Sequence, residues 1–240
     1  MWRVISKMYV WQEEDVQDEV MVQFARRLFD RHGLSTDVPN NFGRNKLPLM
    51  VLSRQAFYNG RPWSDVELLL KSLPPQMAKV ALMRIDGGSY KRTPLHYAAE
   101  YAPSSIIGVM LSLAPDAAFV KDSHGCLPLH IAADGAKRQN VEVVELFLNA
   151  HPQTMLEKDF DGKTPLHYAA ENARYHQHSK FSRGNVVKLL VKACPEAVFI
   201  EDSNGTISLE FFNLDDIFKV LPLVEWSNQA LEMGRKRKRR

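Results

Sequence analysis

One short sequence recurs four times between Lys91 and Glu210. It reads TPLHYAA from Thr93, LPLHIAA from Leu127 and TPLHYAA again from Thr164, and an eroded form, ISLEFF, begins at Ile207. The four starts are 34, 37 and 43 residues apart. Repetition at a period of about 20 to 50 residues is typical of repeat proteins, in which each unit packs only against its neighbours.

The unequal intervals contain a constant spacing. Each unit has a second apolar run, beginning at Ile106, Val143 or Val186, and the next motif starts 21 residues later every time. All the variation lies between the two apolar runs, where the second and third units carry 3 and 9 extra residues. Surfaces that stack must keep their spacing, so the pattern predicts a solenoid whose insertions are confined to one connection of each unit.

Each unit is predicted to be a helical hairpin followed by a tight turn. Threonine at the N-cap and proline at the first helical position start the first helix, and two alanines let it pack closely. The second run, such as VVELFL from Val143, predicts an antiparallel helix that stops before Pro115, Pro152 or Pro195. The segments FVKDSHG, LEKDFDG and FIEDSNG then place Asp and Gly where a turn needs a side-chain bond and a positive φ.

These units resemble ankyrin repeats, whose pattern D-x-x-G-x-T-P-L-H-x-A-A leads into a second helix of the V-V-x-L-L kind. The matching residues are Thr93, Pro94, Leu95, His96, Ala98 and Ala99, and Thr164, Pro165, Leu166, His167, Ala169 and Ala170. Leu127 replaces the threonine once, and Ile207, Ser208 and Glu210 depart further, which favours a cap for the fourth unit. The resemblance covers half of the chain. It implies an all-α solenoid of stacked helix-turn-helix units with short projecting turns and capping helices at both ends.

The remaining sequence predicts how the ends of the stack are closed. An amphipathic pattern runs from Asp15 to His32, and LPLMVLS from Leu47 with DVELLLKSLPP from Asp65 repeats the unit in degenerate form. Terminal repeats must cap the apolar faces of a solenoid. We therefore predict five segments: an N-terminal segment and capping helix over 1–46, a degenerate repeat over 47–92, three repeats over 93–206, a C-terminal degenerate capping repeat over 207–233, and a basic disordered tail over 234–240.

Composition and charge bear on location. The two cysteines and an opening sequence unlike a secretion signal predict reduced thiols in a cytoplasmic or nuclear protein, and no apolar run is long enough for a membrane span. The net charge is +3, but the last six residues are all basic, so the other 234 carry 25 basic and 28 acidic groups, a balance of −3. The basic run consists of Arg235, Lys236, Arg237, Lys238, Arg239 and Arg240. It resembles a nuclear localisation signal read by import receptors; direct phosphate binding and a solubilising end are the alternatives.

The histidines and the missing motifs argue against catalysis. His96, His130 and His167 recur at one position of the repeat, where the family uses the imidazole to bond the preceding threonine and neighbouring backbone, so we predict a structural role. His176 and His178 lie in the long insertion and form a weak metal pair, because no acidic residue or cysteine follows Glu171 there. A phosphate loop, a nucleophile elbow and a zinc-protease motif are absent from the sequence, so we expect neither an enzyme nor a cofactor.

The function predicted is binding of another protein through the concave surface of the stack. By resemblance, the contact residues are Glu100, Tyr101, Ser123, His124, Cys126, Asp134, Phe160, Asp161, Lys163, Glu171, Asn172, Ser203 and Asn204. Tyr101 and Phe160 are the expected hot spots. Tyr175 and Phe181 join them from the insertion over 171–185, which equally well reads as a tolerated surface loop. The alternative function is nucleic-acid association through this insertion and the tail, which the acidic body disfavours.

Overall fold

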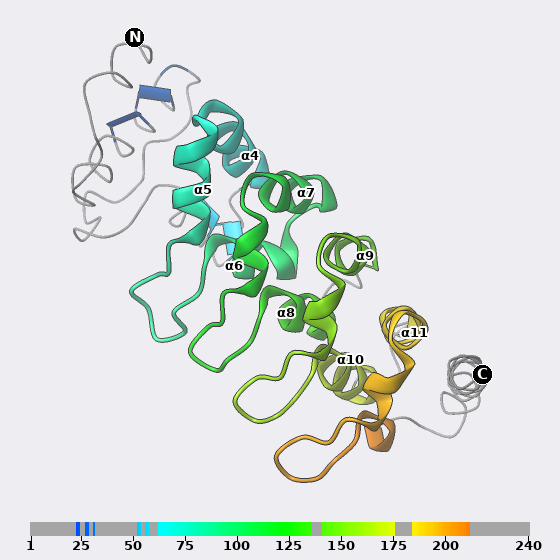
Figure 1. Cartoon of the computed structure of the whole chain (residues 1–240). Helices are drawn as coiled ribbons and strands as arrows, with labels where there is room; N and C mark the ends of the chain where they lie inside the picture. Colours follow the sequence, from blue (N-terminus) through cyan, green and yellow to red (C-terminus); the bar gives the residue numbers. More distant parts are fainter. Residues whose placement is uncertain are drawn as a thin grey trace, which may run out of the picture.

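The computed structural model of the chain is a stack of helix pairs with turns projecting on one side (Figure 1). It describes residues 62–135, 141–175 and 184–211, and before them residues 23–24, 27–28, 31, 52–53 and 56–57. The all-helical solenoid predicted from the sequence is confirmed.

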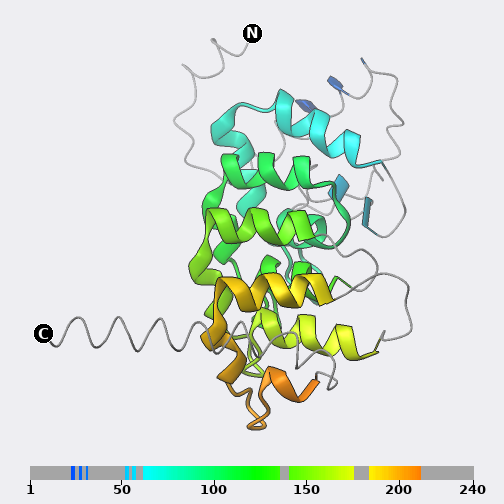
Figure 2. The same ribbon diagram turned by 90° about the vertical axis from the view of Figure 1, so that its right-hand side faces the viewer.

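The stack consists of two layers of helices. The first helices of successive units are α6 (Pro94–Tyr101), α8 (Pro128–Asp134) and α10 (Pro165–Tyr175). The second helices are α4 (Trp63–Ser72), α7 (Ser104–Leu113), α9 (Val141–Ala150) and α11 (Gly184–Ala193), which lie side by side in Figure 2. The three first helices each begin at a proline, whose missing amide hydrogen has no intrahelical partner to lose at that position.

A short 3₁₀ helix, which the sequence did not predict, follows each of the last three second helices. These segments are η1 (Pro115–Phe119), η2 (Pro152–Leu156) and η3 (Pro195–Phe199), and each starts at the proline predicted to end the preceding helix. In the degenerate unit that precedes the first full motif, the corresponding segment is α5 (Pro75–Met83), nine residues long against five in η1. The helix of the degenerate unit is therefore four residues longer than η1.

Small and branched apolar side chains fill the space between the layers. Ala98, Ala132 and Ala169 occupy the same position of the motif and are buried where α6, α8 and α10 pack side by side. Ile107 and Phe147 of the second helices are fully buried in the same continuous core. The small residues allow the first helices to approach closely, and the fixed 21-residue spacing keeps these surfaces in register.

Each motif histidine joins its repeat to the next turn. His96 Nδ1 accepts a hydrogen bond from the Thr93 amide at 3.2 Å, so its Nε2 carries the proton and donates to the Cys126 carbonyl at 3.0 Å. His130 reaches the carbonyls of Glu157 and Lys163 in the same way, at 3.1 and 3.2 Å. The predicted structural role of these histidines is confirmed.

The positions described before residue 62 agree with the predicted patterns. Phe24 and Leu28 are helical and pack against the core, whereas Gln23, Arg27 and Arg31 are helical and exposed, as an amphipathic helix requires. Leu52, within the eroded motif LPLMVLS, and Ala56, three residues after it, are both buried. At the other end, η4 (Ser208–Phe211) begins the fourth unit. The division into five segments stays a prediction, and most of the insertion and the whole tail lie outside the described residues.

The described residues offer neither a membrane-spanning helix nor a metal site. None of the helices there is long and apolar enough to cross a membrane. In the same part of the chain, His, Cys, Asp and Glu side chains form no group of three or more that could hold a metal ion. His176 and His178 fall outside it.

Candidate functional site

The last three of the four projecting turns share one backbone conformation, which the third turn illustrates. Asp159 Oδ1 accepts hydrogen bonds from the amides of Asp161 at 3.0 Å and Lys163 at 2.8 Å, and Gly162 has φ +77°. Asp122 and Asp202 make equivalent bonds in the second and fourth turns. The side-chain bond and the positive φ predicted from the sequence are therefore confirmed.

Backbone hydrogen bonds connect each turn to the next. The Ser123 amide donates to the Tyr90 carbonyl at 2.8 Å, the Phe160 amide to the His124 carbonyl at 3.0 Å, and the Ser203 amide to the Asp161 carbonyl at 2.8 Å. We call the row of four turns the turn edge, and it comprises residues 84–92, 120–126, 157–163 and 200–206. Because both the turns and their junctions are held by hydrogen bonds, the turn edge is a preorganised surface.

Tyrosine side chains of the first helices, one buried and one half-buried, hold the turn edge against the helices. Tyr97 donates its hydroxyl to Asp86 Oδ2 at 2.5 Å, and Tyr168 donates to Asp159 Oδ2 at 2.6 Å. Burial, and to a smaller extent the hydrogen bond to Asp159, raises the pKa of Tyr168. The phenol therefore stays protonated and remains a donor. The second unit has Ile131 at this position, which cannot bond the aspartate. Arg92 of the preceding turn pairs with Asp122 instead, with its Nε 3.4 Å from Asp122 Oδ2.

The contact between turns can be measured with a matched pair of glycines. Gly162 and Gly205 have φ values of +77° and +76°, but a Cβ on Gly162 would lie 2.7 Å from the Ser203 amide nitrogen, whereas none of the described atoms lies within 4 Å of one on Gly205. Gly205→Ala should lower the free energy of unfolding by about 1–2 kcal/mol through backbone strain alone. Gly162→Ala should cost roughly 1–3 kcal/mol more, because the next turn must move. Equal losses in urea melts would contradict the turn-to-turn packing.

The structure places the predicted contact residues in three environments. His124, Phe160, Asp161, Ser203 and Asn204 are exposed on the turn edge. Half-buried positions are Glu100, Tyr101, Ser123, Asp134, Lys163 and Glu171. Tyr175 is described in its backbone only, and Phe181 and the basic run from Arg235 to Arg240 lie outside the described residues.

The predictions for Cys126 and Asn172 need correction. Cys126 is 3% exposed, because its side chain turns inward, with Sγ 3.1 Å from the Tyr168 hydroxyl. Asn172 is 9% exposed and donates from Nδ2 to Asp134 Oδ1 at 3.1 Å. Both side chains support the surface from within and offer a partner little area. Burial also raises the pKa of the thiols of Cys126 and Cys194 to about 11, so neither is a ready nucleophile.

Three aromatic side chains from neighbouring turns stand in a row on the turn edge. Phe160 is 71% exposed and Tyr90 is 46% exposed, with His124 exposed between them. The Tyr90 and His124 rings lie 5.6 Å apart, and the Phe160 ring covers Gly125, where a Cβ would meet Phe160 Cδ1 at 2.7 Å. Tyr90 was not predicted as a contact residue, because its turn precedes the first full motif. The signal in the sequence was its position in IDGGSYKR, which is the turn of the degenerate unit.

Acidic side chains follow the first-helix face beside the turn edge. Glu100, Asp134 and Glu171 occupy the same position of the motif in three successive units. Glu171 is paired with Lys163 at 2.5 Å, and burial raises the pKa of Asp134. The Tyr101 ring packs edge-on against Phe57 with centroids 5.0 Å apart, so part of this predicted hot spot is engaged within the repeat.

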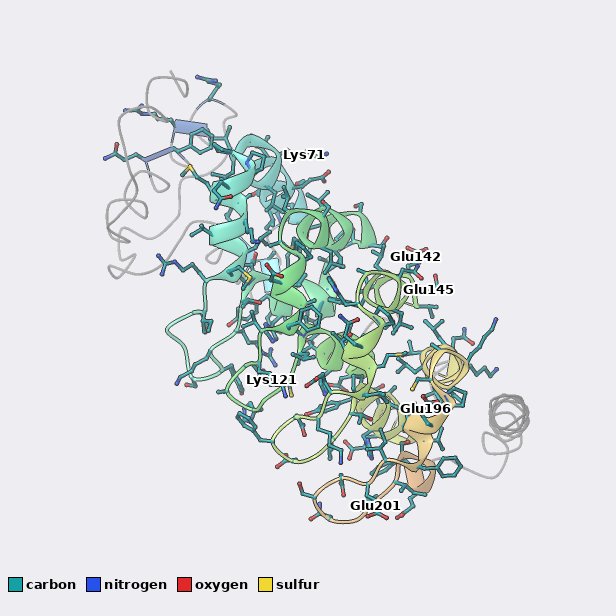
Figure 3. The ribbon with its side chains drawn as sticks, viewed as in Figure 1. Lys71, Lys121, Glu142, Glu145, Glu196 and Glu201 are labelled. Atoms are coloured by element: carbon teal, nitrogen blue, oxygen red, sulfur yellow. The ribbon has the colours of Figure 1, made fainter. Side chains whose placement is uncertain are left out.

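The turn edge changes charge from one end to the other. With histidine neutral, residues 84–92 carry two arginines and one lysine against one aspartate, a balance of +2, and residues 120–126 balance to zero. Residues 157–163 hold three acidic and two basic groups, a balance of −1, and residues 200–206 hold two acidic groups, a balance of −2. Figure 3 shows Lys121 on the second turn and Glu201 on the last.

The repeated helix pairs, tight turns and interlocking histidines define a helical-repeat solenoid. Residues 108–201 match the family described as ankyrin repeats, in three copies. This part of the chain therefore consists of ankyrin repeats, as the motif predicted. No curated protein sequence matches the chain.

Proposed function

We propose that the protein is a non-catalytic scaffold or adaptor that binds another protein through the turn edge and the adjoining first-helix face. The observation that carries this proposal is the row of Tyr90, His124 and Phe160. The Phe160 ring lies over Gly125 of the preceding turn and is still 71% exposed, on a turn that is already fixed by Asp159. Large aromatic side chains on a rigid support are the usual anchors of protein interfaces.

The chemistry of the surface supports binding rather than catalysis. Burial lowers the pKa of His96 and His130 to about 4, and both rings are occupied by backbone hydrogen bonds. The two thiols are protonated and buried. General acid–base catalysis needs a titrating group within reach of a substrate, which these side chains do not provide.

The proposal is tested by comparing two phenylalanines that are both exposed. Phe160→Ser removes the anchor of the row, whereas Phe199→Ser alters η3, away from the aromatic row. Proteins crosslinked to the wild type and identified by mass spectrometry should also be recovered with Phe199→Ser, and should fall about tenfold or more with Phe160→Ser, since a hot spot contributes about 2 kcal/mol or more. Nuclease treatment should leave recovery unchanged. Equal recovery with both variants would refute the proposal.

For the tail we propose nuclear import, with the protein working in the nucleus. Six consecutive basic residues at 235–240 have the composition that import receptors recognise. Residues 234–240 fused to a reporter too large for passive entry should carry it into the nucleus, and the same fusion with the basic residues replaced by glutamine should not. A reporter that stays outside the nucleus would favour the nucleic-acid alternative. The full chain should then bind duplex DNA, with the logarithm of its affinity falling against the logarithm of the salt concentration with a slope of about −5 for six charges.

A further inference from the structure

We infer that the turn edge binds an extended, bipolar polypeptide segment: acidic at the end that lies over the first turn, apolar or aromatic in the middle, and basic at the end that lies over the last two turns. This inference rests on the proposed function and adds the chemistry of the partner and its orientation. It follows from the position of the charges, the aromatic row and one strained residue.

The strained residue is Lys91. In the other three turns, the residue two positions before the motif is Gly125, Gly162 or Gly205, each with φ between +76° and +79°. Lys91 occupies the same position of the first turn with φ +49°, and it is the only described residue other than glycine with a positive φ. A lysine held in the left-handed region costs backbone energy that glycine would avoid, and strain of this kind concentrates at functional sites.

Lys91 lies where a negative charge would be attracted. Its side chain is exposed, it follows Tyr90 of the aromatic row, and it belongs to the turn with the most positive balance. The Arg92 guanidinium lies 5.1 Å from the centre of the Tyr90 ring but is paired with Asp122, so Lys91 is the exposed cation beside the aromatic row. Carboxylates of a partner therefore find complementary charge at this end.

The opposite end attracts cations. Asp161 is exposed directly after Phe160, so a Lys or Arg side chain can stack on the ring and reach the carboxylate at once. Glu201 adds an exposed carboxylate on the fourth turn. Lys158 and Lys163 are engaged, with Lys158 Nζ donating to the Glu201 carbonyl at 2.8 Å and Lys163 paired with Glu171.

The spacing of the turns sets the length of the segment. Packed helices lie about 8–10 Å apart, so four turns extend over about 30 Å. An extended chain rises about 3.3 Å per residue, and roughly nine residues therefore reach from the first turn to the fourth. The middle of such a segment lies over His124 and Phe160, where apolar side chains are favoured.

The test begins with selection of nine-residue peptides, displayed on phage, against the full chain. The enriched peptides should carry carboxylates at one end and Lys or Arg at the other, in one common direction, and should lose binding to Phe160→Ser. In the double variant Lys91→Glu with Asp161→Lys the balances of the first and third turns become 0 and +1, so the preference for one common direction should be lost. Peptides without charge separation, or with charges of one sign, would overturn the inference; if these still required Phe160, the proposed protein-binding surface would stand. Failure to enrich any peptide overturns the inference, and the crosslinking comparison decides the proposed function separately.

A pair of lysine variants separates the local charge from the net charge. Lys91→Gly should raise the urea midpoint, because the strain disappears, and yet weaken the best selected peptide by about 2- to 5-fold, the range for an exposed ion pair. Lys71→Gln removes the same charge from α4, away from the turns (Figure 3), and should leave the affinity unchanged. Equal effects of the two variants would mean that the peptide responds to net charge alone, which would overturn the assignment of Lys91.

Discussion

Replacement of Leu166 by alanine should lower the free energy of unfolding by about 2–5 kcal/mol, the range for truncating a buried leucine. Leu166 is 1% exposed in α10, which packs against α8 on one side and against α11 and η4 on others. The lost methyl groups leave a cavity, because the neighbouring helices are fixed by their own repeats and cannot collapse fully onto the smaller side chain. Urea melts followed by circular dichroism measure the loss.

Thr164→Ala is the control in the same repeat and should cost less, about 0.5–2 kcal/mol. The Thr164 hydroxyl lies 2.9 Å from His167 Nδ1, but the Thr164 amide donates to the same nitrogen at 3.1 Å and remains in the variant. The second unit has Leu127 at this position and therefore lacks the hydroxyl, yet the Leu127 amide still donates to His130 Nδ1 at 3.0 Å. The repeat thus tolerates the loss of the threonine hydroxyl. Equal and negligible effects of the two substitutions would contradict the packing of the motif.

The parts of the fold that follow from local chemistry could be predicted from the sequence. Proline starts, alanine contacts and Asp-x-x-Gly turns each depend on residues close together in the chain, so the pattern contained all the information needed. The motif histidine is the informative exception. His96 bonds Thr93 at the start of its own helix and Cys126 in the turn 30 residues later, and the resemblance to ankyrin repeats predicted bonds to the threonine and to neighbouring backbone that local spacing alone could not.

The parts that were missed depend on three-dimensional packing. The sequence position of Cys126 places it in a turn. Its side chain points inward because Sγ contacts the hydroxyl of Tyr168, which is 42 residues away in the chain. The length of α5 could not be predicted from the sequence, because no residue there marks where the helix ends and the turn begins. The sequence already places Lys91 two residues before the motif, where the other repeats have glycine, but its positive φ became evident only in the structure, because the first turn is longer than the others.

Acid should destabilise the protein between about pH 6.5 and pH 4, and the motif histidines are the reason. Burial lowers the pKa of His96 and of His130 from 6.5 to about 4, and it lowers that of His167 as well. Above pH 6.5 these side chains are neutral in both the folded and the unfolded chain, so their full contribution to stability is present. As the pH falls below 6.5 the unfolded chain binds protons that the folded chain cannot, and the free energy of unfolding decreases.

The loss should be about 3 kcal/mol for each of His96 and His130 by pH 4, since one pKa unit corresponds to about 1.4 kcal/mol. Asp134 acts in the opposite direction, because burial raises its pKa and the folded protein then takes up a proton more readily. His130→Gln isolates one histidine, since glutamine can accept from the Leu127 amide and donate to the Glu157 carbonyl without titrating. The difference in unfolding free energy between pH 7.5 and pH 4.5, from urea melts, should be smaller in this variant by about 2.5 kcal/mol. An unchanged difference would show that the buried imidazole of His130 does not remain neutral in the folded protein.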